Sequence, residues 1–227
     1  MAGKQRERRV TMNIETIESK LNALENQVKA QEKELTTLKD IEAIKKLQKA
    51  YGYYVEHMMA QEIIDCFSDS PDVVLNWIEG QFLGKEGVRR YFDRWREPNP
   101  DFLHQVMPIA GIIDVDPGGK TAKGRWYAFG AIFIPGDTGV MRSFVGGIYE
   151  NEYIKEHGKW KILKINWIIP YAVRIGEGWA TPEQVAAPIL KGEFRDPEPD
   201  IPFTKSDPRY VSGYIFPFHY KHPVTGK

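Results

Sequence analysis

The feature that most constrains the fold is a series of four long strand-like segments between residues 102 and 169. Short turn sequences separate these segments, namely DPGGK at 116–120, PGDTG at 135–139 and HGK at 157–159. Connections rich in Gly, Pro and Asp are typical of hairpins between antiparallel strands. The second half of the chain is therefore predicted to form an antiparallel sheet.

The chain before the strands has a helical pattern with a period of seven over residues 12–40. Apolar residues and one glutamine occupy the two repeating positions: Ile14, Leu21, Val28 and Leu35 in one set, and Ile17, Leu24, Gln31 and Leu38 in the other. This pattern predicts a coiled coil of about four heptads, in which Gln31 would set the register. One helix cannot bury such a stripe alone, so we expect it to associate with another subunit or to fold back onto the rest of the chain.

Three further elements are predicted between the coiled coil and the long strands. The apolar pattern shifts to an ordinary helical period over 41–58, and a short helix follows at about 60–68. A strand is expected at 73–78, and a helix at 84–97. This last helix would turn its apolar side chains inward: Val88, Tyr91, Phe92 and Trp95.

The two ends of the chain differ from the middle in composition. Residues 1–11 include the basic run KQRERR and are expected to be a disordered tail. Residues 178–227 are rich in Pro, charge and aromatic side chains, and we expect a long irregular extension that acts as a lid or wraps a neighbouring subunit. The coiled-coil helix at 12–40 and one domain at 41–177 lie between them.

Composition excludes several classes of function. Lys plus Arg and Asp plus Glu both number 31, so nothing indicates binding to nucleic acid or to a charged membrane surface. Cys66 is the only cysteine, which rules out a disulfide within the chain and a zinc site built from cysteines. The sequence contains no run of about 18 apolar residues, and we expect a cytoplasmic protein without a membrane span.

Several motifs carry a resemblance to a known family. Tyr51 and Glu56 stand five apart and precede Phe67, and three longer stretches follow in order: GKEGVRRYF, LHQVMPIAGIIDVDPGGKTAKGRW and GGIYENEYIKEHGKWKILKINW. Together these stretches resemble the SnoaL-like family of the nuclear transport factor 2-like superfamily over roughly residues 38–172. The resemblance implies an α+β fold in which a cone-shaped, curved antiparallel sheet wraps around N-terminal helices and leaves a closed-ended cavity.

The resemblance also implies a range of functions, because a fold does not fix an activity. Catalytic members are dehydratases, isomerases, cyclases, epoxide hydrolases and carbon–carbon lyases that usually need no cofactor. We expect a cofactor-independent lyase that acts on a small aromatic or polycyclic hydroxylated substrate, by dehydration or by retro-aldol cleavage. The alternatives are an isomerase with the same cavity and a non-catalytic module that binds a small molecule or a protein and oligomerises through the coiled coil. With any of these functions we expect a homo-oligomer, either a dimer or a trimer.

Three residues match the catalytic positions of the family. His104 opens the first long strand and could move a proton near neutral pH. Glu56 would be a carboxyl group with a raised pKa that acts as acid or base and supports His104. Tyr51 could donate a hydrogen bond to a developing oxyanion. The structural alternatives are a strand-end histidine bonded to the backbone, a solvated glutamate and a core tyrosine.

The substrate-binding residues are predicted from the aromatic character of the strands. Five are expected to line the cavity: Tyr54, Trp77, Tyr127, Phe129 and Asn166. Alternation along a strand puts Tyr127 and Phe129 on one face and Trp126 on the other. His57 is expected to be structural. No HxxxH or HxH pair occurs in the sequence, so no metal site is predicted.

Overall fold

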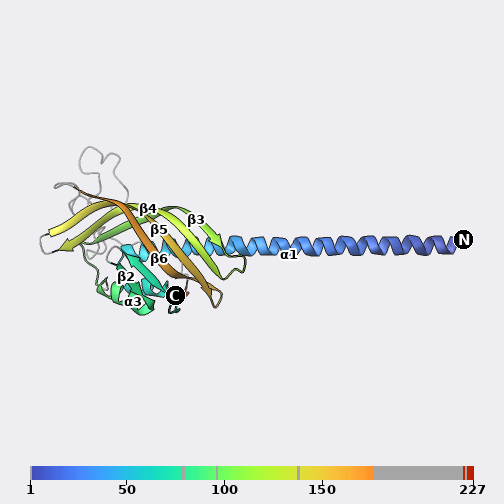
Figure 1. The fold of residues 1–227 in the computed structure, drawn as a ribbon, viewed down its shortest axis with the longest axis horizontal. Helices are drawn as coiled ribbons and strands as arrows, with labels where there is room; N and C mark the ends of the chain where they lie inside the picture. Colours follow the sequence, from blue (N-terminus) through green and yellow to red (C-terminus); the bar gives the residue numbers. More distant parts are fainter. Residues whose placement is uncertain (1, 78–79, 96, 137–138, 176–221, 223) are drawn as a thin grey trace, which may run out of the picture. The chain divides into compact units, whose positions relative to one another are not determined.

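The computed structural model divides the chain into two compact units, residues 1–42 and residues 43–227. It describes residues 2–77, 80–95, 97–136, 139–175, 222 and 224–227 (Figure 1).

The first unit is helical. Helix α1 (Ala2–Glu56) starts in this unit and continues into the second one. The segment 12–40 is helical as its pattern predicts, and the helix also covers residues 2–11, where the sequence suggests a disordered tail. The predicted coiled-coil partner of this helix is not tested by a single chain and stays a prediction.

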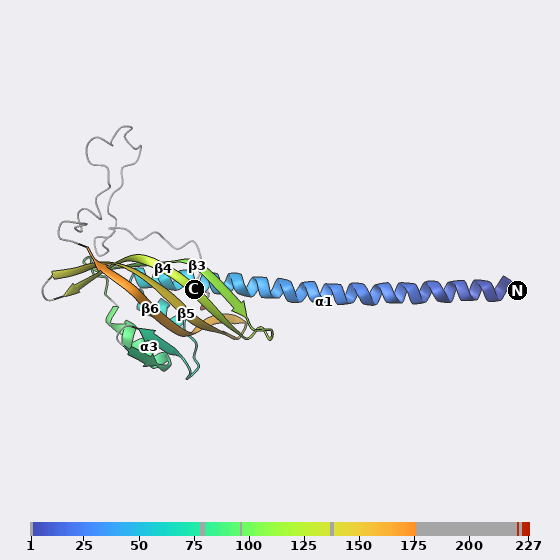
Figure 2. The ribbon, with the colours of Figure 1, turned by 45° about the horizontal axis from the view of Figure 1, so that its top comes forward.

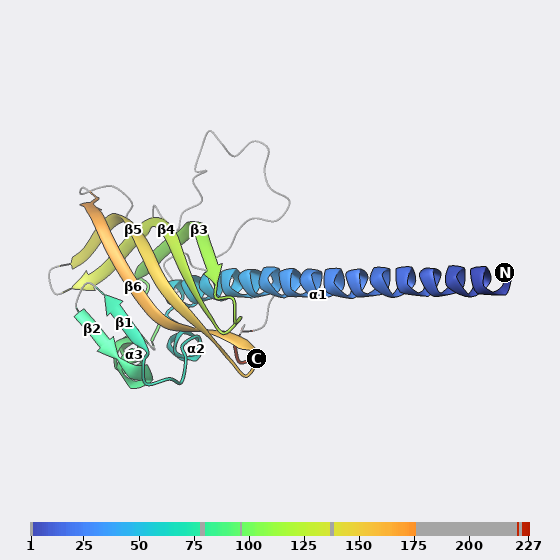
Figure 3. The ribbon, with the colours of Figure 1, turned by 45° about the vertical axis from the view of Figure 1, so that its right-hand side comes forward.

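The second unit is built on one six-stranded sheet, which is curved and unclosed (Figures 1 and 3). Its strand order is β2-β1-β6-β5-β4-β3. The strands are β1 (Val74–Trp77), β2 (Gly80–Leu83), β3 (Leu103–Val115), β4 (Thr121–Gly136), β5 (Gly139–Glu156) and β6 (Lys159–Arg174). Strands β3 to β6 are joined by the hairpin turns that the sequence predicts, and each pairs with the next in antiparallel register.

The expectation of a wholly antiparallel sheet is wrong at one edge. Strand β1 runs parallel to β6, with Val74 opposite Lys164 and Asn76 opposite Asn166. Strand β2, a short segment that the sequence analysis does not predict, pairs with β1 to form an antiparallel hairpin. The sheet is therefore mixed, because the chain enters it from the helical layer and not from the end of a neighbouring long strand.

Irregular pairing helps to explain the curvature of the long strands. The register shifts between Pro108 and Ala110 on β3, and again between Gly146 and Ile148 on β5. A bulge adds a residue to one strand of a pair and bends it. The bent strands lie side by side and leave a concave side (Figure 3).

The helices pack against the sheet through apolar side chains spaced by three and four residues. In the last turns of α1, Ile44, Leu47 and Tyr51 are at most 1% exposed. Helices α2 (Ala60–Asp65) and α3 (Gly84–Phe92) complete this layer; α2 is labelled in Figure 3, and α3 in Figures 2 and 3. Both helices are shorter than predicted. Helix α3 ends early because the chain passes at Asp93–Trp95 into a single 3-10 turn. Strand β1 matches its predicted range closely.

The last residues of the chain pack against the second unit. His222 stacks on Tyr54, with ring centroids 5.2 Å apart and planes inclined by 6°. Its Nε2 donates to the carbonyl oxygen of Glu62 at 2.8 Å, and Val224 is part of the core. The predicted extension at 178–227 otherwise lies outside the described residues, so its role as lid or wrap stays a prediction.

Candidate active site

Trp77 is the centre of a buried group of rings contributed by five elements. It ends β1, and each of its ring neighbours comes from a different element. The neighbours are Tyr91 on α3 at 6.0 Å, His104 on β3 at 6.4 Å, Tyr149 on β5 at 6.5 Å and Trp167 on β6 at 6.0 Å between ring centroids. All five side chains are at most 8% exposed. We call these five residues the Trp77 cluster.

His104 is the titratable base of this cluster. Its ring contacts both Trp77 and Phe102, and the Phe102 centroid is 6.5 Å away with planes inclined by 15°. Burial lowers the pKa of His104 to about 4, and a backbone hydrogen bond opposes this shift only in part. The imidazole is therefore neutral at pH 7, and one of its ring nitrogens carries a lone pair that can accept a proton.

The Tyr51 hydroxyl is buried and has no hydrogen-bond partner among the described residues. The ring itself is well packed, with Phe67 and Phe92 edge-on at 6.0 and 6.5 Å. Burial, followed by the nearby hydroxyls of Tyr149 and Tyr91, raises the pKa of Tyr51 well above its usual value. The hydroxyl therefore keeps its proton and is available as a hydrogen-bond donor.

The end of α1 fixes the position of Glu56. Met58 has a φ of 55°, and its N–H and that of Met59 bond back to the carbonyl oxygens of Val55 and Tyr54. These two bonds form the closing turn that commonly ends a helix, here without the usual glycine. The chain therefore leaves the helix directly after Glu56.

Glu56 contacts the residue that follows His104 on β3. Its Oε1 accepts a hydrogen bond from Gln105 Nε2 at 3.2 Å. Burial raises the pKa of the Glu56 carboxyl group above its usual value. The charge of His57 and the hydrogen bond from Gln105 offset only part of this increase. Neighbouring residues of a strand point to opposite faces, so Glu56 lies against Gln105 and a direct pairing with His104 stays a prediction.

Two predicted binding residues, Tyr54 and Asn166, have their described contacts away from the Trp77 cluster. Tyr54 stacks on His222. Asn166 Oδ1 accepts from Asn76 Nδ2 at 2.6 Å across the parallel pair β1–β6. Both contacts are structural. The Tyr54–His222 stack joins α1 to the last residues of the chain, and the Asn76–Asn166 hydrogen bond joins β1 to β6.

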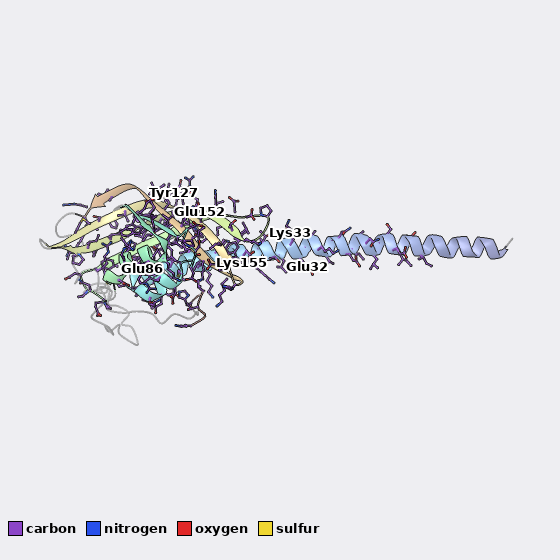
Figure 4. All side chains as sticks on the ribbon, turned by 60° about the horizontal axis from the view of Figure 1, so that its bottom comes forward. Glu32, Lys33, Glu86, Tyr127, Glu152 and Lys155 are labelled. Atoms are coloured by element: carbon purple, nitrogen blue, oxygen red, sulfur yellow. The ribbon has the colours of Figure 1, made fainter. Side chains whose placement is uncertain are left out.

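Tyr127 and Phe129 lie on the exposed face of β4. Their side chains are 63% and 41% exposed, and Tyr127 is labelled in Figure 4. Trp126, which precedes Tyr127, and Ala128, which lies between the two, are each 4% exposed. The predicted alternation is therefore found, but the face that Tyr127 and Phe129 share is not the face that carries His104.

The predicted site residues do not include Tyr91, Tyr149 and Trp167, although all three belong to the Trp77 cluster. A buried polar network on the same sheet was not predicted either. Tyr153 Oη donates to Gln48 Oε1 at 2.8 Å and accepts from Trp126 Nε1 at 2.9 Å, while Asn151 Nδ2 donates to Gln48 Oε1 at 2.9 Å. The spacing of Tyr149, Asn151 and Tyr153 by two residues was the available signal, because it puts all three on one face of β5.

In the described part of the chain, no three His, Cys, Asp or Glu side chains are grouped in a way that could hold a metal ion. No helix within the same residues has the length and apolar character needed to cross a membrane.

Residues 36–166 match the SnoaL-like domain family, a range that includes Tyr51, Glu56 and His104. The family prediction made from the motifs is thereby confirmed.

Solved structures share the fold at low sequence identity. A hexachlorocyclohexane dehydrochlorinase, LinA-type3 from Novosphingobium barchaimii, has a TM-score of 0.53 at 19% identity, over 66% of this chain and 99% of that one. A protein from Novosphingobium aromaticivorans provisionally named a scytalone dehydratase has 0.52 at 15%, over 64% and 98%. Another from that organism, provisionally named an aromatic ring hydroxylase, has 0.51 at 21%, over 61% and 94%.

Proposed function

Because the chain belongs to the SnoaL-like domain family, we propose that it is a cofactor-independent lyase for a small aromatic or polycyclic hydroxylated compound. Two of the proteins with the same fold carry the names of a dehydrochlorinase and, provisionally, a dehydratase, both of which are eliminating enzymes. This is support by analogy of fold, so the residues must carry the rest of the argument.

The observation that carries the proposal is the unpartnered Tyr51 hydroxyl. A buried polar group without a hydrogen-bond partner destabilises a protein by about 1–3 kcal/mol, and such groups are rare in native structures. A substrate oxygen would satisfy the hydroxyl. The bond would strengthen as negative charge develops on that oxygen, which is the requirement for stabilising a transition state.

His104 is the proposed base. In a dehydration, the imidazole removes a proton from the carbon next to the one that bears the hydroxyl group. The electrons of that C–H bond form the new double bond, and the C–O bond breaks. In a retro-aldol cleavage, the imidazole instead takes the hydroxyl proton, a carbonyl group forms, and the carbon–carbon bond breaks. Either role requires a neutral imidazole, which His104 has at pH 7, although a pKa of about 4 makes it a weak base in the ligand-free protein.

Glu56 is the proposed acid. Burial raises the pKa of its carboxyl group, so a larger fraction carries a proton near neutral pH. That proton would go to the departing hydroxide, which leaves as water, or to the carbanion that remains after cleavage. Solvent exchange then returns the proton from the imidazolium to the carboxylate and resets both groups.

Tryptophan and tyrosine rings support the choice of substrate class. The Trp77 cluster supplies flat apolar surface next to the base, which suits an aromatic or polycyclic ligand. Of the predicted binding residues, Trp77 is the one with a described contact to His104. Tyr54, Tyr127, Phe129 and Asn166 stay predictions.

The experiment is a turnover assay of the full chain against hydroxylated aromatic and polycyclic compounds, with loss of water or chain cleavage read by mass spectrometry. Replacing His104 by Ala should abolish turnover while the folded far-ultraviolet spectrum is retained. Turnover that is unchanged in His104→Ala would refute the mechanism. Ligands that bind tightly but are recovered unaltered would favour the alternative of a non-catalytic binding module.

A further inference from the structure

Helix α1 carries a stripe of large apolar side chains that is open to solvent. Seven of the eight heptad core positions are apolar and at least half exposed: Ile14 50%, Ile17 64%, Leu21 55%, Leu24 58%, Val28 50%, Leu35 51% and Leu38 55%. Isolated exposed apolar residues are normal, but a continuous stripe of them marks an interaction surface. We call these seven residues and Gln31 the heptad stripe.

The charged residues that flank the heptad stripe identify its occupant. The positions that precede one core set are Lys20, Gln27 and Glu34, and those that follow the other core set are Glu18, Glu25, Glu32 and Lys39. All seven are exposed. In a parallel coiled coil in register, each residue of the first group faces the residue five positions further on in the partner helix.

From this pattern we infer that the heptad stripe is covered by the same stripe of a second copy of this chain, with the two helices parallel and in register. Lys20 then faces Glu25 of the other copy, and Glu34 faces Lys39. Gln27 faces Glu32 without repulsion. Every charged pair is therefore attractive, and each occurs twice by symmetry.

The antiparallel alternative places some like charges together. In that arrangement, residues of each flanking group face residues of the same group. Lys20 would then face Glu34 or Gln27 of the other copy without repulsion, but the second group contains three glutamates. With the two stripes fully overlapped, Glu25 would face Glu25 or Glu32 of the other copy, and like charges at close range are unfavourable. The same sequence thus favours one orientation and disfavours the other.

Gln31 adds a constraint on register. In register, it lies opposite Gln31 of the other copy, where the two amides can hydrogen-bond to each other. A shift by one heptad would put Gln31 against Leu24 or Leu38 and leave its amide without a partner. A single polar core position of this kind specifies register at some cost in stability. The inference concerns α1 alone and does not depend on the proposed chemistry.

A charge-exchange series on the full chain tests the pairing. Lys20→Glu puts two glutamates together, Glu25→Lys puts two lysines together, and the double variant restores opposite charges. Each single variant should raise the dissociation constant of the dimer roughly tenfold, while the double variant returns it near the wild-type value. Residues 20 and 25 are five apart and do not pair within one helix, so restoration reports contact between copies.

Lys33 provides the matched control, because it lies on the side of the helix opposite to the heptad stripe; it is labelled in Figure 4. Lys33→Glu changes the net charge as Lys20→Glu does and should leave the dissociation constant unchanged. Sedimentation equilibrium at low salt gives these constants. A monomeric wild-type chain at tens of micromolar would overturn the inference, as would a double variant no stronger than the singles.

Cysteine cross-linking tests orientation by a second route. Ile17→Cys should form a disulfide between copies under mild oxidation, because residue 17 meets its own counterpart only in a parallel, in-register pair. Ser19→Cys, two residues away and directed outward, should stay reduced, and the native Cys66 is buried. Equal cross-linking of both variants, or none at Ile17→Cys, would overturn the parallel arrangement.

Discussion

The indole of Trp77 lies over the imidazole of His104, with ring centroids 6.4 Å apart and planes inclined by 27°. Phe102 lies against the same imidazole. This enclosure replaces water around the His104 ring and disfavours its charged form, which is why its pKa falls to about 4. The neutrality of the proposed base is thus a consequence of packing.

Lowering the pH should decrease the stability of the protein, because His104 is harder to protonate in the folded state than in the unfolded state. Unfolded, His104 takes up a proton near pH 6.5, whereas the folded protein resists protonation until about pH 4. The unfolded state therefore binds more protons between these values, and stability drops as pH falls through the window. Between pH 6.5 and pH 5 the loss should be about 2 kcal/mol. Urea unfolding at a series of pH values measures it.

The matched variants for this test are His104→Phe and His157→Asn. His104→Phe removes the titrating group, so the difference between its curve and that of the wild type isolates the contribution of His104. His157 is exposed in the turn between β5 and β6, and its replacement should leave the pH dependence intact. Parallel curves for wild type and His104→Phe would contradict the burial of a neutral imidazole.

The ligand-free protein should show little coupling between Glu56 and His104. The Glu56 carboxylate accepts a hydrogen bond from Gln105, and burial, not a carboxylate, dominates the pKa of His104. Glu56→Gln should therefore leave the His104 pKa, measured by nuclear magnetic resonance titration, close to that of the wild type. A clear fall in the variant would instead establish the direct His104–Glu56 dyad that the family resemblance implies.

Much of the fold could be predicted because its signals are local. Hairpin turns such as DPGGK fix which strands are neighbours, and apolar spacing in α1 identifies Ile44, Leu47 and Tyr51 as core. The parallel pairing of β1 with β6 could not be predicted, because it joins segments about ninety residues apart that share no turn. The short strand β2 carries too few residues to show a period.

The site could be predicted only in part, for a related reason. Alternation correctly separates Trp126 from Tyr127 and Phe129. It does not reveal which face is inward, because both faces of β4 carry aromatic residues. The partner of Glu56 depends on side-chain rotamers at the junction of a helix end and a strand, and neither spacing nor composition specifies rotamers.

Gly147 should be intolerant of any side chain. A Cβ atom there would overlap the indole ring of Trp167, which itself contacts Trp77 and Tyr149. Gly147→Ala should therefore destabilise the protein by about 1–3 kcal/mol and change its tryptophan fluorescence, because the cluster has to move. Gly136→Ala is the control, since a Cβ there comes no closer than 3.6 Å to any neighbouring atom. Equal unfolding midpoints for the two variants would refute this packing.

The Tyr153 hydroxyl should contribute to stability. It donates to Gln48 Oε1 and accepts from Trp126 Nε1 in a buried network. Tyr153→Phe leaves the Trp126 N–H without its partner, and the expected loss is about 1–3 kcal/mol in urea unfolding. Tyr127→Phe, at an exposed position on β4, should change stability by less than about 0.5 kcal/mol.

The Tyr51 hydroxyl should have the opposite effect on stability. Like that of Tyr153 it is fully buried, but it has no hydrogen-bond partner among the described residues. Removing an unsatisfied buried hydroxyl relieves its desolvation penalty, so Tyr51→Phe should stabilise the ligand-free protein by about 1 kcal/mol or more. If the hydroxyl serves a bound substrate, the same variant should lower turnover or ligand affinity while raising the unfolding midpoint. A variant that is destabilised to the extent of Tyr153→Phe would mean that Tyr51 has a partner within the protein, and the case for a substrate contact at this hydroxyl would fail.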